Sequence, residues 1–215
     1  YILQGRVKVN GEITTQLGTT VSPSDQVELD GKILQAESKN VYIMLNKPEK
    51  VMSTSSDPEG RPTVTQLIDL PYRLYPVGRL DYNTSGLILL TNDGDAAYRL
   101  THPKYEIEKE YLAVIKGEID RRDILKLERG VQIEETITTA PAKVSVTGGT
   151  QHTVTLSITI HEGRNREVRK MLEAIDKELL SLMRIRIGNI NLGKLSSGAY
   201  RELNSTELAY INSLK

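Results

Sequence analysis

Short β-type segments dominate the pattern of apolar residues along this 215-residue chain. The clearest is 153–160, where every second residue is apolar, which is typical of an antiparallel strand with one buried face. Segment 87–91 is continuously apolar and indicates a buried central strand. Comparable signals predict further strands over 41–45, 75–77, 111–115 and 180–187.

Helical segments are fewer. Apolar residues at helical spacing predict helices over 63–70, 93–101, 120–129, 166–175 and 205–214. Asp93 and Ser205 are the expected N-caps of two of these helices. Because strands outnumber helices and follow no βαβ rhythm, we predict an α+β fold: a mixed, mainly antiparallel sheet flanked by helices, with a cleft crossing one face.

The N-terminal residues read as a separate β-rich module. Segment 6–9 alternates polar and apolar residues, and Asn10-Gly11 and Asp30-Gly31 are hairpin-turn signals. The polar segment 35–40 is the expected linker, so we predict two domains, residues 1–37 and 41–215. Since the chain starts at Tyr1 inside a structured pattern, we expect the module to be incomplete.

Composition excludes several kinds of chemistry. The chain has no Cys, which rules out disulfides, thiol catalysis and Cys-ligated zinc. Its three His residues show no metal-ligand spacing, and no Walker or dinucleotide-binding glycine motif occurs. Because 28 Lys+Arg balance 28 Asp+Glu, an RNA partner would need a local basic surface. With no apolar run approaching the roughly 20 residues of a membrane span and no signal peptide, we expect a cytoplasmic protein without a membrane partner.

Asp81 lies in the segment richest in turn-forming residues, 78–86. Apolar strands are predicted on both sides of this loop, and they would hold the Asp81 carboxylate in place, as a catalytic group requires. Taken alone, an Asx-turn in which Asp81 caps its own loop is the simpler account.

Segment 161–170 ends a strand and opens a basic helix on which Arg166, Arg169 and Lys170 share a face. Such a cluster can hold phosphates or pair with a carboxylate, or it can be a solvated face with glutamate partners. Tyr111, on a predicted strand, has a ring that could stack on a nucleobase or simply fill the core.

Together with Leu45-Asn46-Lys47-Pro48, these three segments resemble the ordered motifs of the pseudouridine synthases. The similarity is to the branch that modifies ribosomal RNA and carries a small ribosomal-protein-S-four-like RNA-binding module at its N-terminus. Segment 5–12 resembles the latter part of that module, without the helices that precede it in the family. Segments 57–64 and 162–169 are most similar to the subgroup acting on large-subunit (23S) rRNA, and a small-subunit (16S) target stays open.

The resemblance implies roles for individual positions. Asp81 matches the family's catalytic aspartate, and Arg169 matches the arginine that pairs with that carboxylate. Tyr111 matches the tyrosine that stacks on the target base, and Arg79 matches an arginine that helps to hold the displaced nucleotide. Two further residues are expected to contact RNA near the site, Lys47 and Arg166.

The implied activity is isomerisation of a specific uridine to pseudouridine, with Asp81 as covalent catalyst and a flipped-out target base. No metal and no cofactor are expected, because the reaction involves no net redox change and no hydrolysis. The expected partner is rRNA, 23S rather than 16S, or an assembling ribosomal subunit, and the protein is expected to be a monomer. Two other classes stay open: a non-catalytic assembly factor on the same fold, and a glycosidase-like enzyme, for which a second catalytic carboxylate would be needed.

Overall fold

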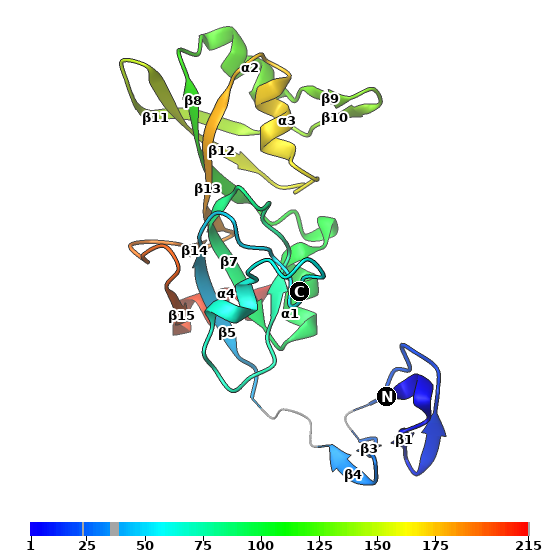
Figure 1. Ribbon diagram of the computed structural model, residues 1–215. Helices are drawn as coiled ribbons and strands as arrows, with labels where there is room; N and C mark the ends of the chain where they lie inside the picture. Colours follow the sequence, from blue (N-terminus) through cyan, green and yellow to red (C-terminus); the bar gives the residue numbers. More distant parts are fainter. Residues whose placement is uncertain (23, 35–38, 215) are drawn as a thin grey trace. The chain divides into compact units, whose positions relative to one another are not determined.

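The computed structural model describes residues 1–22, 24–34 and 39–214. The chain divides into two compact units, Tyr1–Asn40 and Val41–Lys215 (Figure 1). Residues 35–38 of the predicted linker lie outside the described residues.

The first unit contains a four-stranded antiparallel sheet in the order β2-β1-β3-β4. Both predicted hairpin turns are confirmed, because Asn10 and Gly11 join β1 to β2, and Asp30 and Gly31 join β3 to β4. Each turn residue has a φ between 52° and 85°, as a two-residue type I′ turn requires. The elements are η1 (Ile2–Gln4), β1 (Val7–Val9), β2 (Glu12–Thr14), β3 (Val27–Leu29) and β4 (Lys32–Leu34).

The second unit is built on a nine-stranded sheet, counted over the described residues, whose main path runs β11-β12-β8-β13-β7-β5-β15. Strand β14 pairs with β13, and β6 pairs with β7. Every strand pair of this sheet is antiparallel except β13 with β7, so the predicted mixed, mainly antiparallel α+β fold is confirmed. The strands are β5 (Tyr42–Lys47), β6 (Tyr75–Val77), β7 (Ser85–Thr91), β8 (Lys109–Lys116), β11 (Lys143–Thr150), β12 (Thr153–Ile160), β13 (Leu179–Ile187), β14 (Ile190–Asn191) and β15 (Tyr200–Glu202). A separate short hairpin consists of β9 (Gln132–Glu134) and β10 (Ile137–Thr138).

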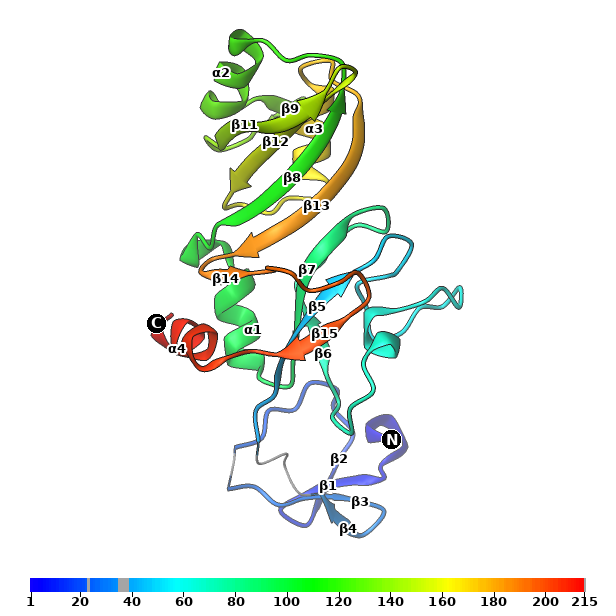
Figure 2. The ribbon, with the colours of Figure 1, turned by 90° about the vertical axis from the view of Figure 1, so that its left-hand side faces the viewer.

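Four α-helices flank this sheet in the described part of the chain: α1 (Gly94–Thr101), α2 (Arg121–Arg129), α3 (Glu167–Glu173) and α4 (Ser205–Ser213). Helices α1 and α4 lie beside the half of the sheet that contains β5 and β7, and α2 and α3 lie beside the half that contains β8, β11 and β12 (Figure 2). The two halves meet where β13 pairs with β7, over only two registered residue pairs.

Of the two predicted helix N-caps, the one of α1 is confirmed and the one of α4 is wrong. The Asp93 carboxylate accepts hydrogen bonds from the backbone N–H groups of Asp95 and Ala96, so this predicted N-cap is confirmed. The predicted cap Ser205 is wrong, because it is already the first helical residue of α4. Asn204 is the cap: its backbone is extended, and its side chain accepts from the Glu207 N–H.

The predicted helix over 63–70 is also wrong in kind and length. Only Val64–Leu67 is helical, as a 3-10 turn (η2) capped by Thr63. The helix ends because the backbone is extended at Ile68 (φ −115°, ψ 113°), and Leu67, Ile68 and Leu70 all pack against the core.

The core has two parts, one on each face of β5 and β7. Ile88 and Leu90 of β7 belong to one hydrophobic cluster, and Leu87 and Leu89 belong to the other. Because successive strand residues point to opposite faces, a strand buried on both faces is apolar along most of its length. This is the physical reason for the continuous apolar run that identified the central strand.

Candidate active site

A cavity of about 320 Å³ opens where segments far apart in the sequence meet beside the β13–β7 junction. Its walls come from the loop before β7, the first residues of β8, the end of β12 with the loop that follows, and β13. Four of the residues singled out in the sequence line it: Arg79, Asp81, Tyr111 and Arg166. The fold therefore brings together residues that are separated by up to 87 positions in the chain (166 minus 79).

Asp81 sits on a loop that is fixed on both sides. The preceding residue, Leu80, is buried, and its backbone N–H and C=O both bond to the Ser53 hydroxyl, at 3.1 and 2.9 Å. The Thr84 N–H donates to the Asp81 carbonyl at 3.0 Å. Among the described residues, the Asp81 carboxylate accepts no hydrogen bond from its own loop, so the Asx-turn is not formed, and 29% of the side chain stays exposed at the cavity.

Arg169 reaches from α3 to the loop that carries Asp81. Its Nη2 donates to the Asn83 carbonyl at 2.6 Å and to the Thr84 hydroxyl at 3.1 Å. Its Nε lies 3.7 Å from Asp81 Oδ2, which is ion-pair distance but too long for a hydrogen bond. Arg169 therefore fixes the backbone of the loop and places a positive charge next to the Asp81 carboxylate. It does not form a bidentate hydrogen-bonded pair with that carboxylate.

Tyr111 lies on β8 with 8% of its surface exposed, and it is the cross-strand neighbour of Arg184 on β13. Arg79 and Arg166 are exposed where they line the cavity. Arg166 takes a left-handed backbone conformation (φ 53°) just before α3, and its nearest acidic group, Glu173, is 3.9 Å away. Exposed pairs of this length contribute little, so the Arg166 guanidinium is available to an anion such as an RNA phosphate.

Lys47 departs from the expectation of an RNA contact. The side chain is fully buried at the end of β5, and its Nζ donates to the carbonyls of Pro48 and Val51 at 3.0 and 2.9 Å. Burial lowers the Lys47 pKa to about 8, while the nearby carboxylates of Glu49 and Asp81 act in the opposite direction. A direct RNA contact by Lys47 is inconsistent with this burial; the ammonium ties the chain after β5 together and contributes to the field at Asp81.

The lowered Lys47 pKa predicts a pH dependence of stability. Between the folded value of about 8 and the ordinary value of 10.5, the unfolded chain holds a proton that the folded chain lacks, so the free energy of unfolding rises with pH. We expect the unfolding free energy of wild type to rise relative to that of Lys47→Met across this window and to run parallel below it. Urea titrations from pH 7 to 11 measure this difference, and parallel curves throughout would show an unshifted lysine.

Five charged residues at the cavity were not predicted to be part of the site: Glu162 and Arg164, which form an ion pair at 2.7 Å, and Glu167, Lys109 and Arg184. Glu167 is buried, which raises its pKa, and its carboxylate accepts from the N–H groups of Gly163 and Arg164 at 2.8 and 2.7 Å, fixing the loop after β12. Lys109 donates to the carbonyls of Ile107 and His161 at 3.0 and 3.2 Å, and burial lowers its pKa. Arg184 is the last of these five residues. A charged residue inside the apolar pattern of β13 is a signal in the sequence, but Arg184 and Arg186 both carry it.

Comparison with known proteins identifies the family. The family model described as RNA pseudouridylate synthase matches residues 41–174, and the S4 domain model matches residues 1–27. The ribosomal large subunit pseudouridine synthase B of Bacillus subtilis is 46% identical over 99% of this chain and 88% of its own length. The protein of the same name from Yersinia pestis is 42% identical over 99% of this chain and 69% of its own length. A crystal structure of a pseudouridylate synthase aligns with a TM-score of 0.75 at 32% identity, covering 98% of this chain and 90% of that one.

The chain belongs to the RNA pseudouridylate synthase family and is an enzyme of that class. This supports the catalytic interpretation over that of a non-catalytic assembly factor. None of the helices in the described ranges has the length and apolar character needed to cross a membrane.

Proposed function

We propose that this enzyme isomerises a specific uridine of large-subunit (23S) rRNA, with Asp81 as the catalytic carboxylate. The observation that carries the proposal is the convergence of Asp81 and Tyr111 on one cavity, with the Arg169 guanidinium 3.7 Å from the carboxylate. The choice of the large subunit rests on the names of the near-full-length relatives. We further expect a cytoplasmic monomer that acts on free rRNA or on an assembling subunit.

The cavity suits a single nucleotide that has left its stack. Extrusion of a base costs a few kcal/mol, which is partly offset when the base stacks on an aromatic ring, worth about 1–3 kcal/mol. Tyr111 supplies that ring at the wall of the cavity, and the exposed Arg79 lies where it could fill the space left in the RNA. The exposed side chain of Arg166 adds positive charge for the RNA backbone, whereas the charge of Arg164 is paired with Glu162 at 2.7 Å.

The reaction breaks the N1–C1′ bond, turns the base and forms a C5–C1′ bond, after which C5 loses its hydrogen. Asp81 would attack C1′, add to C6 of the ring, or remove the C2′ proton. Each route needs a carboxylate held close to the nucleotide, and the anchoring of Leu80 and Thr84 supplies that positioning. Arg169 compensates the carboxylate charge from 3.7 Å.

The N-terminal unit is proposed to contribute RNA binding. The S4 domain model matches residues 1–27, which include β1 and β2 of its sheet. We propose residues 41–215 as the catalytic domain, because every cavity-lining residue lies within them.

The stacking role of Tyr111 predicts different effects for two substitutions. Tyr111→Phe keeps the ring and should convert RNA within a few-fold of the wild-type rate. Tyr111→Ala removes the ring and should lose about 10–100-fold, equivalent to about 1–3 kcal/mol of stacking. Single-turnover rates of pseudouridine formation measure both, and equal losses in the two variants would refute stacking as the role of Tyr111.

Tritium release tests the proposed activity. Transcripts of 23S and 16S rRNA made with 5-tritiated uridine release tritium when C5 forms its new bond to C1′. We expect wild type to release tritium from the 23S transcript, in an amount close to one uridine per molecule. Release from the 16S transcript alone would replace the proposed substrate, and release from neither transcript nor from subunit particles would refute the function.

A further inference from the structure

Arg184 is a buried arginine whose hydrogen-bonding capacity is only partly used. It lies on β13 with 3% of its surface exposed, and its Nε donates to the Leu87 carbonyl at 2.8 Å. Its Nη2 is buried and has no hydrogen-bond partner. No carboxylate among the described residues lies within ion-pair distance of Arg184. A buried cation in this state is unfavourable unless something else supplies an acceptor.

The position of Arg184 indicates where that acceptor would come from. Arg184 lines the cavity, and its cross-strand partner on β8 is Tyr111. Cross-strand partners point to the same face of a sheet, so both side chains emerge on the cavity side. The positive charge of Arg184 acts on the cavity. After burial, it is a further cause of the lowered pKa of Lys109, another cavity-lining residue.

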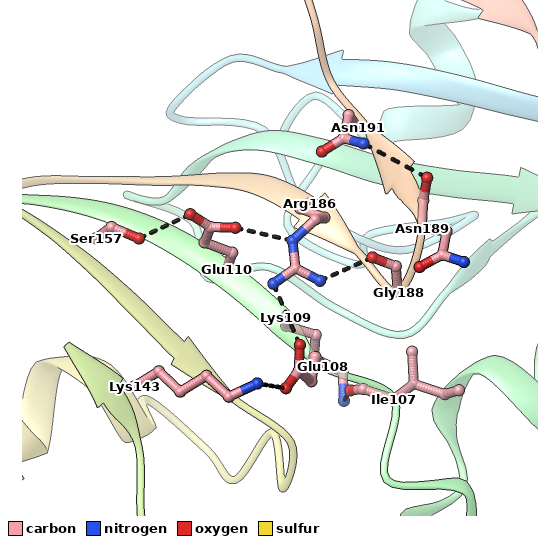
Figure 3. Close-up of polar contacts among 10 residues, drawn as sticks. All are labelled: Ile107, Glu108, Lys109, Glu110, Lys143, Ser157, Arg186, Gly188, Asn189 and Asn191. Carbon is pink, nitrogen blue, oxygen red and sulfur yellow. Dashed lines mark hydrogen bonds and ion pairs between the residues drawn. The ribbon is translucent and has the colours of Figure 1, made fainter. Parts of the chain in front are cut away.

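On the same strand, each of the three side-chain nitrogens of Arg186 donates a hydrogen bond (Figure 3). Its guanidinium donates to Glu110 at 2.8 Å, to Glu108 at 3.3 Å and to the Gly188 carbonyl at 2.8 Å. Lys143 and Ser157 complete the network by donating to the two glutamates. None of these five side chains lines the cavity.

A purely structural role explains the Nε hydrogen bond of Arg184 but not its unpartnered Nη2. Its Nε bond to Leu87 ties β13 to β7 at the junction of the two halves of the sheet. The two strands are already in close contact there, because a Cβ on Gly86 would lie 2.2 Å from the Arg184 carbonyl. The unpartnered Nη2 takes no part in this junction.

We propose that the guanidinium of Arg184 donates a hydrogen bond to a uracil carbonyl oxygen of the flipped-out uridine and stabilises the negative charge that the ring acquires during catalysis. This inference rests on the proposed function. It adds a residue that binds the base itself, where Asp81 acts on the nucleotide and Tyr111 stacks on the ring.

The charge on the ring follows from the electron balance of the reaction. When the N1–C1′ bond breaks, its electron pair stays on the uracil and is shared among N1, O2 and O4. If Asp81 adds to C6 instead, the electron pair of the C5–C6 bond moves toward O4. If the C2′ proton is removed first, the base still departs with the N1–C1′ pair. A guanidinium donor already in place in a buried site stabilises this charge without reorganisation.

The test combines substitution in the protein with substitution of a single atom in the RNA. A short RNA containing the mapped target is prepared with uridine, 2-thiouridine or 4-thiouridine at that position, because sulfur is a weak acceptor. Single-turnover conversion is followed by nucleoside chromatography for wild type, Arg184→Met and the control Arg186→Met. Circular dichroism and thermal melting establish that each variant is folded.

We expect Arg184→Met to convert the uridine RNA about 10²–10³-fold more slowly than wild type. Replacing the contacted oxygen by sulfur should lower the conversion rate of wild type and of Arg186→Met by about tenfold or more. The same replacement should cause no further loss of rate in Arg184→Met. This non-additivity is the signature of a direct contact. If Arg184→Met fails to fold, Arg184→Lys is compared in the same way and should show a sulfur effect different from wild type.

Two outcomes would overturn the inference, and they are distinguishable. If wild type converts the uridine RNA while both thio-RNAs slow wild type and the Arg184 variant by equal factors, only the Arg184 contact is wrong. If wild type does not convert the uridine RNA at all, the proposed function fails and the inference fails with it.

Discussion

Asp81→Asn should reduce the single-turnover rate of pseudouridine formation by about 10⁴-fold or more, because the amide cannot attack carbon or remove a proton and losses of this order follow removal of a catalytic nucleophile. Folding should be nearly unaffected. The side chain is 29% exposed, the two residue types have the same shape, and the one ion pair that is lost is 3.7 Å long. Such a pair contributes about 1 kcal/mol or less.

The matched control for Asp81 is Asp95→Asn. Asp95 is exposed on the first turn of α1, and it does not line the cavity. This variant should convert RNA at the wild-type rate. Normal conversion by Asp81→Asn, with the control also normal, would exclude Asp81 as the catalytic carboxylate.

Arg169→Lys should lower the conversion rate by about 10²-fold while the affinity for RNA stays within a few-fold. A lysine cannot hold the Asn83 carbonyl and the Thr84 hydroxyl and also place charge next to Asp81. A displacement of the loop by about 1 Å is enough for a loss of this size. The variant should also be less stable by roughly 1–3 kcal/mol, because polar groups of the loop lose their partner.

The split between rate and affinity is what tests Arg169 as a positioning residue. Arg129→Lys is the matched control, since Arg129 is exposed on the last turn of α2, and it should match wild type in rate, affinity and stability. Single-turnover rates, RNA titrations and thermal melting give the three quantities. If Arg169→Lys loses stability but converts RNA at the wild-type rate, Arg169 is only a structural tie between α3 and the loop.

Much of the fold was predictable because its strongest elements carry local signals. The alternation in β12, the continuous apolar run of β7 and the paired turn residues Asn10-Gly11 each identify one backbone geometry. Strand β11 was not predicted, because its signals are weaker: it ends in Thr147-Gly148-Gly149-Thr150, and most of its residues are exposed. Strand β15 was not predicted either; it spans only Tyr200–Glu202 and depends on pairing with β5, far away in the sequence.

The site was predictable only in part, because local sequence signals identify some of its residues and long-range packing determines the others. Asp81 and Tyr111 lie in segments whose residue order is distinctive, and the structure brings both to one cavity. The burial of Lys47 could not be read from its neighbours, because it arises when the chain turns back so that Val51 supplies a carbonyl. Arg184 and Arg186 look alike in the sequence, and only the strand pairing separates the arginine with carboxylate partners from the one that faces the cavity.

The most direct test of the central claim is nucleotide-resolution mapping of pseudouridine in 23S rRNA after incubation with wild type or Asp81→Asn, using carbodiimide modification and primer extension. We expect a new stop at one uridine with wild type and no new stop with Asp81→Asn. A stop that persists with Asp81→Asn, or no stop with wild type on either naked 23S rRNA or large-subunit particles, would contradict the account.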